Sequence, residues 1–324
     1  MKEMNILYAI DEWKKDYSRY LWVSILSLLE NNKEENVHIY ILSQYIEESN
    51  KKELIRIVNE YWKKISFSEW EIVPEKFVSV LSVEWDWRRP MATYYRFFFL
   101  NKFDIKDRVL YLDCDTIVNK SLSEFYYSDF EWNAIIWQSD IGLTSYGQKK
   151  KYSLKEYINA WVYLYNVDSF REIDLYKKIK KVNDKFGHPN YNDQDYINII
   201  FKDKIKIVDK LQLLSCFYFY SDYTDYFVIH TTQKPNAWWY EYCPEKIEQL
   251  FNKYLEQTKW KTWLWYKKHI SIKEYCNHLY DFITKSLAYT AYNIFGTKAW
   301  VFVTNTQWNI YNWVYKVLKF LRIK

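Results

Sequence analysis

The stretch Arg108-Val109-Leu110-Tyr111-Leu112-Asp113-Cys114-Asp115 sets two carboxylates directly after the most strand-like segment of the chain. Its apolar and aromatic part predicts a buried β-strand. Two carboxylates one residue apart, at the carboxyl end of a rigid strand, can bind the same hard cation. Mg²⁺ or Mn²⁺ bound there would suit diphosphate oxygens, which it would neutralise as a Lewis acid. The alternative is a solvated Asp pair that caps the next helix.

Strand and helix patterns alternate on both sides of this stretch. Strands are predicted where β-branched and aromatic residues cluster, at residues 6–10, 37–42, 65–73, 108–112, 134–137, 162–166, 205–208 and 226–230. Helices are predicted from the spacing of apolar residues at 20–31, 47–61 and 90–100. Such alternation is typical of an α/β layered fold with a mainly parallel sheet, whose ligands bind beyond the carboxyl ends of the strands.

The sequence changes in character after residue 257. Residues 258–324 are rich in Trp, Tyr and Lys and lack strand alternation, which predicts a helical, basic and aromatic appendage to a domain formed by residues 1–257. A cationic amphipathic helix with an aromatic face can lie in a membrane interface, which would give the protein peripheral contact with a membrane. A helix packed on its own domain has the same pattern, so the sequence leaves both interpretations open.

Composition excludes several classes of protein. With 324 residues, of which 49% are hydrophobic and 27% charged, the chain can bury a large core, so it is not collagen-like, disordered or a disulfide scaffold. A net charge of +5 without a basic stripe among stacking residues argues against nucleic-acid binding. The four cysteines form no CxxC pair, so neither a zinc site nor a disulfide framework is expected. Because the sequence shows no secretory signal and no transmembrane run, we expect a cytoplasmic protein, peripheral on the inner face of the membrane if the appendage binds lipid.

Other polar residues stand where the predicted elements begin or end. Asp11 follows the first strand and could face a polar ligand or serve as a helix cap. His230 ends the last strand, where it could be a third metal ligand, although a lone histidine is more often structural. Residues 191–195 open a helix with carboxylate and amide groups that could bind sugar hydroxyls or cap that helix. Arg96 lies among aromatic residues and is expected to be partly buried and to need an anionic partner.

Several common nucleotide-binding and hydrolase motifs are missing from the sequence. There is no GxxxxGK[ST] loop and no GxGxxG after the first strand, which argues against P-loop and dinucleotide-binding proteins. Neither a GxSxG elbow nor an HExxH helix occurs, so the sequence does not point to an α/β-hydrolase or a zinc protease.

Six short motifs in order resemble the pattern of glycosyltransferase family 8, which includes bacterial lipopolysaccharide galactosyl- and glucosyltransferases and glycogenin. They are residues 6–11, 92–96, 109–115, 159–161 and 192–195, and His230. The resemblance covers residues 4–256 and implies a GT-A fold, the nucleotide-diphospho-sugar transferase fold with a mixed, mainly parallel sheet flanked by helices. It also implies a retaining transfer of a hexose from UDP-glucose or UDP-galactose, with Mn²⁺ or Mg²⁺ as the metal.

The same resemblance implies roles for individual residues. The metal would be held by Asp113, Asp115 and His230. The uridine would be faced by Ala9 and Asp11, and the diphosphate would be reached by Lys234. The donor sugar would be lined by Arg96, Asp140, Asn159, Asp193 and Gln194, of which the last two are the expected catalytic residues. Because an amide is a poor nucleophile, we expect front-face attack by the acceptor hydroxyl rather than a double displacement through Gln194.

The sequence leaves three functions open. The leading one is hexose transfer to a cell-surface glycan or lipopolysaccharide acceptor. The second is self-glucosylation as in glycogenin, for which tyrosines are plentiful but no single acceptor tyrosine stands out. The third is a non-catalytic nucleotide-sugar- or carbohydrate-binding module, and the presence of His230 together with both carboxylates of the Asp-x-Asp motif argues against it.

Glycine is rare in the chain and tryptophan is abundant. There are 4 Gly and 17 Trp, whereas ordinary usage of about 7% would give about 23 glycines. Family 8 tends to have glycine at the places occupied here by Trp22, Trp132 and Trp161, and Trp62 stands where a helix should end, a position that favours glycine. We therefore hypothesise that many of these tryptophans are glycines in the natural protein, encoded by UGA codons in an organism that reads UGA as glycine. The alternative is an aromatic-rich protein with genuine tryptophans.

Overall fold

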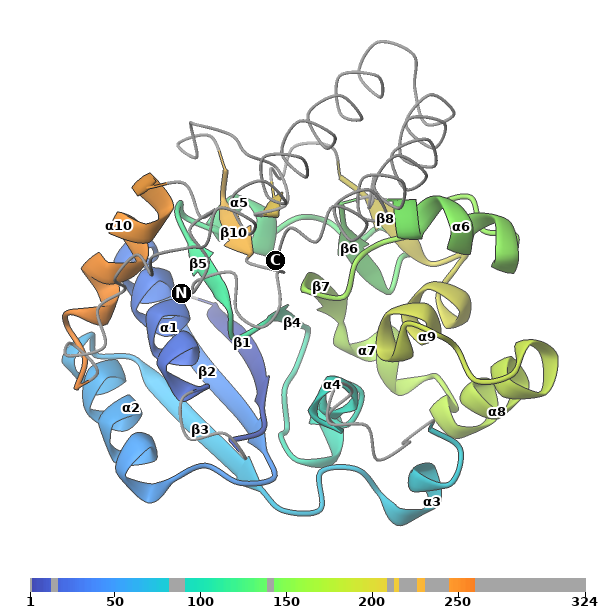
Figure 1. The fold of residues 1–324 in the computed structure, drawn as a ribbon, viewed down its shortest axis with the longest axis horizontal. Coiled ribbons are helices and arrows are strands. Elements are labelled where there is room, and N and C mark those ends of the chain that lie inside the picture. Colours follow the sequence, from blue (N-terminus) through green and yellow to red (C-terminus); the bar gives the residue numbers. More distant parts are fainter. Residues whose placement is uncertain are drawn as a thin grey trace, which may run out of the picture.

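The computed structural model describes residues 2–12, 17–81, 91–138, 143–208, 213–215, 226–230 and 245–259. Seven strands form the larger sheet, in the order β3-β2-β1-β4-β7-β6-β8 (Figure 1). Their bounds are β1 (Glu3–Ile10), β2 (Asn36–Ser43), β3 (Lys64–Glu69), β4 (Arg108–Leu112), β6 (Ile135–Trp137), β7 (Val162–Asn166) and β8 (Ile205–Ile207). A smaller sheet has the order β5-β10-β9, with β5 (Thr116–Val118), β9 (Leu213–Ser215) and β10 (Val228–His230).

The larger sheet is mainly parallel, with one reversed strand. β1 lies parallel to both β2 and β4, and β2 lies parallel to β3. β7 runs antiparallel to β4 and to β6, while β6 is parallel to β8. Strand β1 is buried along nearly its whole length, as expected for a central strand covered on both faces. The mixed, mainly parallel α/β sheet flanked by helices that the sequence predicts is therefore confirmed.

Helices flank the sheet, with α1 (Ser18–Asn31), α2 (Glu48–Glu60) and α10 (Glu245–Leu255) on the side of β1 to β3 and α6 (Leu143–Tyr152), α8 (Leu175–Phe186) and α9 (Asn192–Ile200) on the side of β6 to β8 (Figure 1). Short ones are α3 (Glu75–Val78), α4 (Ala92–Tyr95), α5 (Ser123–Tyr126), α7 (Val167–Arg171) and the 3₁₀ turn η1 (Phe99–Asn101). Almost every residue of α1 is buried because α1 contacts β5, α2 and α10. Helix α1 therefore contacts the smaller sheet through β5, and the hydrogen bond between Ser24 and Tyr8 joins it to β1 of the larger sheet.

The prediction of one helix over residues 90–100 is wrong. The helical part is limited to α4, and the N–H groups of Phe97 and Phe98 bond carbonyls only three residues earlier, as in 3₁₀ turns. Aromatic residues are modest helix formers, and this run buries aromatic side chains at nearly every position. An α-helix would turn some of these rings toward solvent, so tertiary burial favours the tighter and less regular path.

Trp62 and Trp70 adopt the left-handed backbone conformation, with φ of +58° and +65°. After α2, the N–H of Trp62 bonds the carbonyl of Asn59 at 2.9 Å, and the N–H of Lys63 bonds that of Val58 at 3.2 Å. These two bonds form a Schellman motif, whose left-handed position is usually glycine. Gly187 ends α8 with a similar φ of +71°. The backbone at residues 62 and 70 is therefore of the kind that favours glycine, whereas Trp22 lies fully buried inside helix α1.

None of the helices in the described part of the chain is long and apolar enough to cross a membrane. Of the predicted appendage, residues 258–324, only the first two residues are described. Its helical structure, its membrane contact and the domain boundary at residue 257 thus stay predictions.

Candidate metal and donor site

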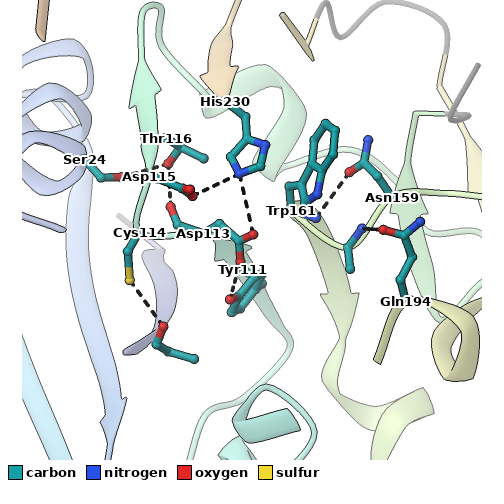
Figure 2. Close-up of polar contacts among 12 residues, drawn as sticks. Ser24, Tyr111, Asp113, Cys114, Asp115, Thr116, Asn159, Trp161, Gln194 and His230 are labelled. Carbon is teal, nitrogen blue, oxygen red and sulfur yellow. Dashed lines mark hydrogen bonds and ion pairs between the residues drawn. The ribbon is translucent and has the colours of Figure 1, made fainter. Parts of the chain in front are cut away.

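Asp113, Asp115 and His230 meet where the two sheets meet (Figure 2). Asp113 follows β4, Asp115 precedes β5, and His230 ends β10, where it pairs with Thr116. The His230 Nε2 atom lies 2.9 Å from Asp115 Oδ1 and 3.7 Å from Asp113 Oδ2. One ligand atom from each residue lies within 4.8 Å of the other two. Two carboxylates and an imidazole at this spacing fit a divalent cation such as Mn²⁺. We call this cluster the triad.

Neighbouring groups hold the triad's backbone in place. The N–H of Asp113 donates to the carbonyl of Trp161 at 2.8 Å, which ties the end of β4 to the start of β7. The Thr116 hydroxyl donates to the Asp113 carbonyl at 2.8 Å and also bonds Ser24 of α1. Cys114 points away from both carboxylates, and its thiol donates to the Ala9 carbonyl at 3.2 Å (Figure 2). In this turn between β4 and β5, the cysteine thus points to the opposite side from the two aspartates (Figure 2).

Arg96 is buried and bridges the triad to helix α9. Its guanidinium lies 3.0 Å from Asp113 Oδ1 and 3.4 Å from Asp193 Oδ2. It also stacks over the ring of Tyr111, 4.0 Å from the ring centroid, and donates to the Ala160 carbonyl. The expectation that Arg96 is buried with an anionic partner is correct, since two carboxylates flank it.

Burial shapes the protonation of the carboxylates around Arg96. Burial raises the pKa of Asp193 to about 7, while Arg96 acts in the opposite direction and the charge of Asp113 adds to the rise. Burial also raises the pKa of Asp113, again opposed by Arg96 and favoured by the nearby charge of Asp115. The site therefore concentrates negative charge that a bound cation would relieve.

The segment before β7 lies beside the start of α9. The Ala160 N–H donates to Gln194 Oε1 at 3.2 Å, and the Trp161 N–H donates to Asn159 Oδ1 at 3.2 Å (Figure 2). Asn159 Oδ1 also accepts from the indole of Trp137 at 3.1 Å. The ring of Trp161 packs on that of His230, with centroids 4.3 Å apart. An indole thus covers one face of the third residue of the triad.

Ala9 and Asp11 lie at the end of β1, which is next to β4 in the sheet. The register pairs Leu7 with Tyr111, so the same register brings Ala9 level with Asp113. Glu12 is different, because its buried carboxylate accepts from the backbone N–H of Glu47 at 2.6 Å and caps the start of α2. Two predicted site residues, Asp140 and Lys234, lie outside the described residues.

Two residues near the site, Tyr111 and Tyr157, were not predicted as contributors from the sequence. Tyr111 donates its hydroxyl to Asp113 Oδ1 at 2.6 Å. The role of Tyr111 could have been predicted, because it stands two residues before Asp113, and in extended chain such side chains point to the same side. Tyr157 donates its hydroxyl to Asp195, one of the residues predicted to open α9, and no local pattern marks that contact.

The fold and the triad are those expected of a GT-A glycosyltransferase. A model of glycosyl transferase family 8 matches residues 5–225, and the chain belongs to this family. It is 28% identical over 216 residues to a putative glycosyltransferase of Haemophilus influenzae, covering 64% of this chain and 62% of that protein. It is also 28% identical over 218 residues to the lipopolysaccharide 1,3-galactosyltransferase of Salmonella typhimurium, with the same two coverages. The match thus spans less than two thirds of either relative.

Solved structures resemble the chain in fold. The galactosyltransferase LgtC, in complex with donor and acceptor sugar analogues, aligns with a TM-score of 0.67 and 20% identity, over 84% of this chain and 99% of that one. The glycosyltransferase GlyE of Streptococcus pneumoniae aligns with a TM-score of 0.54 and 17% identity, over 83% of this chain and 67% of that one. At these identities the likeness supports the fold, and the GT-A prediction is confirmed.

Proposed function

We propose that this protein transfers a hexose from UDP-glucose or UDP-galactose to a cell-surface glycan or glycolipid such as lipopolysaccharide, with retention of configuration. The observation that carries the proposal is the triad of Asp113, Asp115 and His230 beside a buried Arg96, in a chain of family 8. The lipopolysaccharide galactosyltransferase among its relatives supports the substrate class.

The proposal gives each residue a task. The triad would hold Mn²⁺ or Mg²⁺, and a cation there would neutralise the charge that develops on the β-phosphate as UDP leaves. Ala9 and Asp11, at the end of β1, would face the uridine. The sugar would lie between helix α9 and the segment before β7, within reach of Asn159, Asp193 and Gln194. Asp140 for the sugar and Lys234 for the diphosphate are assigned by the family resemblance alone.

Retention of configuration is implied by the family resemblance, and Gln194 bears on how it is achieved. Gln194 is a neutral amide and a poor nucleophile, so we propose front-face attack by the acceptor hydroxyl. In this scheme the bond from the sugar to the phosphate oxygen breaks, the acceptor oxygen forms a bond on the same face, and the departing phosphate takes the hydroxyl proton. The chain's own residues would orient the sugar and compensate charge.

The decisive experiment replaces Asp113 by Asn and measures UDP release from both UDP-sugars with Mn²⁺. The change keeps the shape of the side chain and removes a metal-ligating charge, so we expect turnover to fall at least about a hundredfold. Asp203→Asn is the matched control, because its side chain is 85% exposed and lies in the loop before β8. Activity retained by Asp113→Asn would overturn the metal assignment.

The same assay separates the alternatives. If the wild-type protein binds UDP with Mn²⁺ but releases none from either sugar nucleotide, the non-catalytic binding module becomes the better description. Transfer of labelled sugar onto the protein's own tyrosines would instead support self-glucosylation. We also propose a cytoplasmic location, with peripheral membrane contact through residues 258–324.

A further inference from the structure

Asp195 is a fully buried carboxylate at the start of α9. Its Oδ1 accepts from the Tyr157 hydroxyl at 2.6 Å. Its Oδ2 accepts from the Tyr152 hydroxyl at 3.0 Å and from the Tyr191 N–H at 3.1 Å. Three donors offset much of the cost of burying this charge. A carboxylate so enclosed does not touch a substrate, and its effect on chemistry must pass through a neighbour.

Tyr157 is that neighbour. Because an ionised carboxylate only accepts hydrogen bonds, the Tyr157 hydroxyl donates to Asp195 and turns a lone pair toward Gln194. The Nε2 atom of Gln194 donates to that oxygen at 3.2 Å. At the other end of the same amide, Oε1 accepts from the Ala160 N–H at 3.2 Å. Rotating the amide by 180° would place oxygen against oxygen and N–H against N–H, so the network selects one orientation.

We propose that Asp195 and Tyr157 are positioning residues that fix the orientation of the Gln194 amide toward the donor sugar. Tyr157 and Asp195 are buried, whereas Gln194 is partly exposed. Two side chains fixed in the core thus hold the side chain of Gln194 at the edge of the site. Gln194 keeps one N–H and one lone pair beyond these two bonds, a pair that suits a sugar hydroxyl. The inference rests on the proposed function, in which Gln194 faces the sugar.

The structure supplies a matched pair of substitutions. Tyr157→Phe and Tyr152→Phe each remove one hydroxyl from the same carboxylate, and both rings are buried. Only the Tyr157 hydroxyl also bonds Gln194. We expect Tyr157→Phe to lower kcat for sugar transfer about 10- to 100-fold through a mispositioned amide. We expect Tyr152→Phe to keep kcat within about twofold of wild type, and both variants to bind UDP with Mn²⁺ as tightly as wild type, because neither tyrosine contacts the triad.

A double-mutant cycle with Gln194→Ala tests whether the effect passes through this amide. If it does, adding Tyr157→Phe to Gln194→Ala lowers kcat no further. Equal losses in Tyr157→Phe and Tyr152→Phe, or fully additive losses in the cycle, would overturn the positioning role and leave a structural one.

A crystal structure of Tyr157→Phe tests the inference without any assay. We expect the Gln194 side chain to rotate or to occupy more than one conformation, while Tyr152→Phe leaves it unchanged. An unchanged Gln194 in the Tyr157→Phe structure would contradict the inference whatever the protein catalyses. Absence of sugar transfer by the wild-type protein, with Gln194 displaced in the variant, would instead count against the proposed function alone.

Discussion

Arg96 lies between two carboxylates, one buried and one partly buried. Asp113 belongs to the triad and Asp193 to helix α9, and the guanidinium lies within 3.4 Å of both. Its planar fork can serve two partners at once, which a lysine could not do as well. Even so, burial outweighs this attraction at Asp193, and the pKa of that carboxyl is raised to about 7. Asp193 therefore sits close to half protonation near neutral pH.

This raised pKa predicts a pH dependence of stability in metal-free protein. The folded state binds the Asp193 proton more tightly than the unfolded state, whose ordinary pKa is 3.8. The contribution to the free energy of unfolding is therefore complete below about pH 4 and is lost as the pH rises through about 7. The Asp193→Asn variant has no carboxyl group that titrates at this position. We therefore expect its free energy of unfolding to fall less than that of wild type between pH 5 and pH 8 in EDTA.

Urea denaturation at both pH values measures that difference. Asp203→Asn, an exposed aspartate, should keep the wild-type pH dependence. Identical pH dependence in Asp193→Asn and wild type would show that Asp193 titrates normally.

At the scale of the elements, the end of α2 carries the clearest mismatch between side chain and backbone. Trp62 occupies the left-handed position of a Schellman motif, and 92% of its side chain is exposed. A left-handed conformation costs a non-glycine residue about 1 kcal/mol or more. Because so exposed an indole has little packing to lose, we expect Trp62→Gly to raise the melting temperature by about 2 °C. Calorimetry of the variant measures the shift.

Trp62→Ala is the control, since alanine removes the indole but keeps the left-handed strain. An equal rise in both variants would mean that the indole itself was unfavourable. The codons decide the wider hypothesis about UGA. If Trp22, Trp132 and Trp161 are all encoded by UGG, the hypothesis is wrong. A native peptide with the mass of glycine at residue 62 would support it directly.

Much of the larger sheet could be predicted from local sequence, for a physical reason. Central strands such as β1 and β4 are buried on both faces and therefore read as continuous apolar runs. The grouping of Asp113, Asp115 and His230 was expected from the family resemblance, whereas local sequence alone indicated only that each stands at the end or start of a strand. The direction of β7 did not, because direction depends on which strands it pairs with. The contact between Tyr157 and Asp195 joins residues 38 positions apart and leaves no local trace.

At the scale of the whole molecule, the triad joins the two sheets. Asp113 follows a strand of the larger sheet, whereas His230 ends a strand of the smaller one. A cation bound by both would link them and stabilise the folded state in proportion to its occupancy. We expect UDP with Mn²⁺ at about 100 times the dissociation constant to add about 2.7 kcal/mol to the free energy of unfolding.

Thermal shift assays in the presence of UDP check this expectation. The rise in melting temperature should vanish in EDTA and in Asp113→Asn, while Asp203→Asn should behave as wild type. A rise with UDP alone, undiminished by EDTA, would argue against a metal at the triad.

The reversal of β7 has a consequence for how such a site can diversify. The chain leaves β4 toward the triad, but it enters β7 from the same side, with Leu112 paired to Val162. The two aspartates of the triad thus follow one strand, and the proposed sugar-facing segment precedes another. Changes in residues 153–161 that keep the bond from the Asp113 N–H to the Trp161 carbonyl would therefore alter the proposed sugar-facing side while Asp113 and Asp115 stay in place. Exchanging such residues between relatives would show whether donor preference changes while the proposed metal site stays intact.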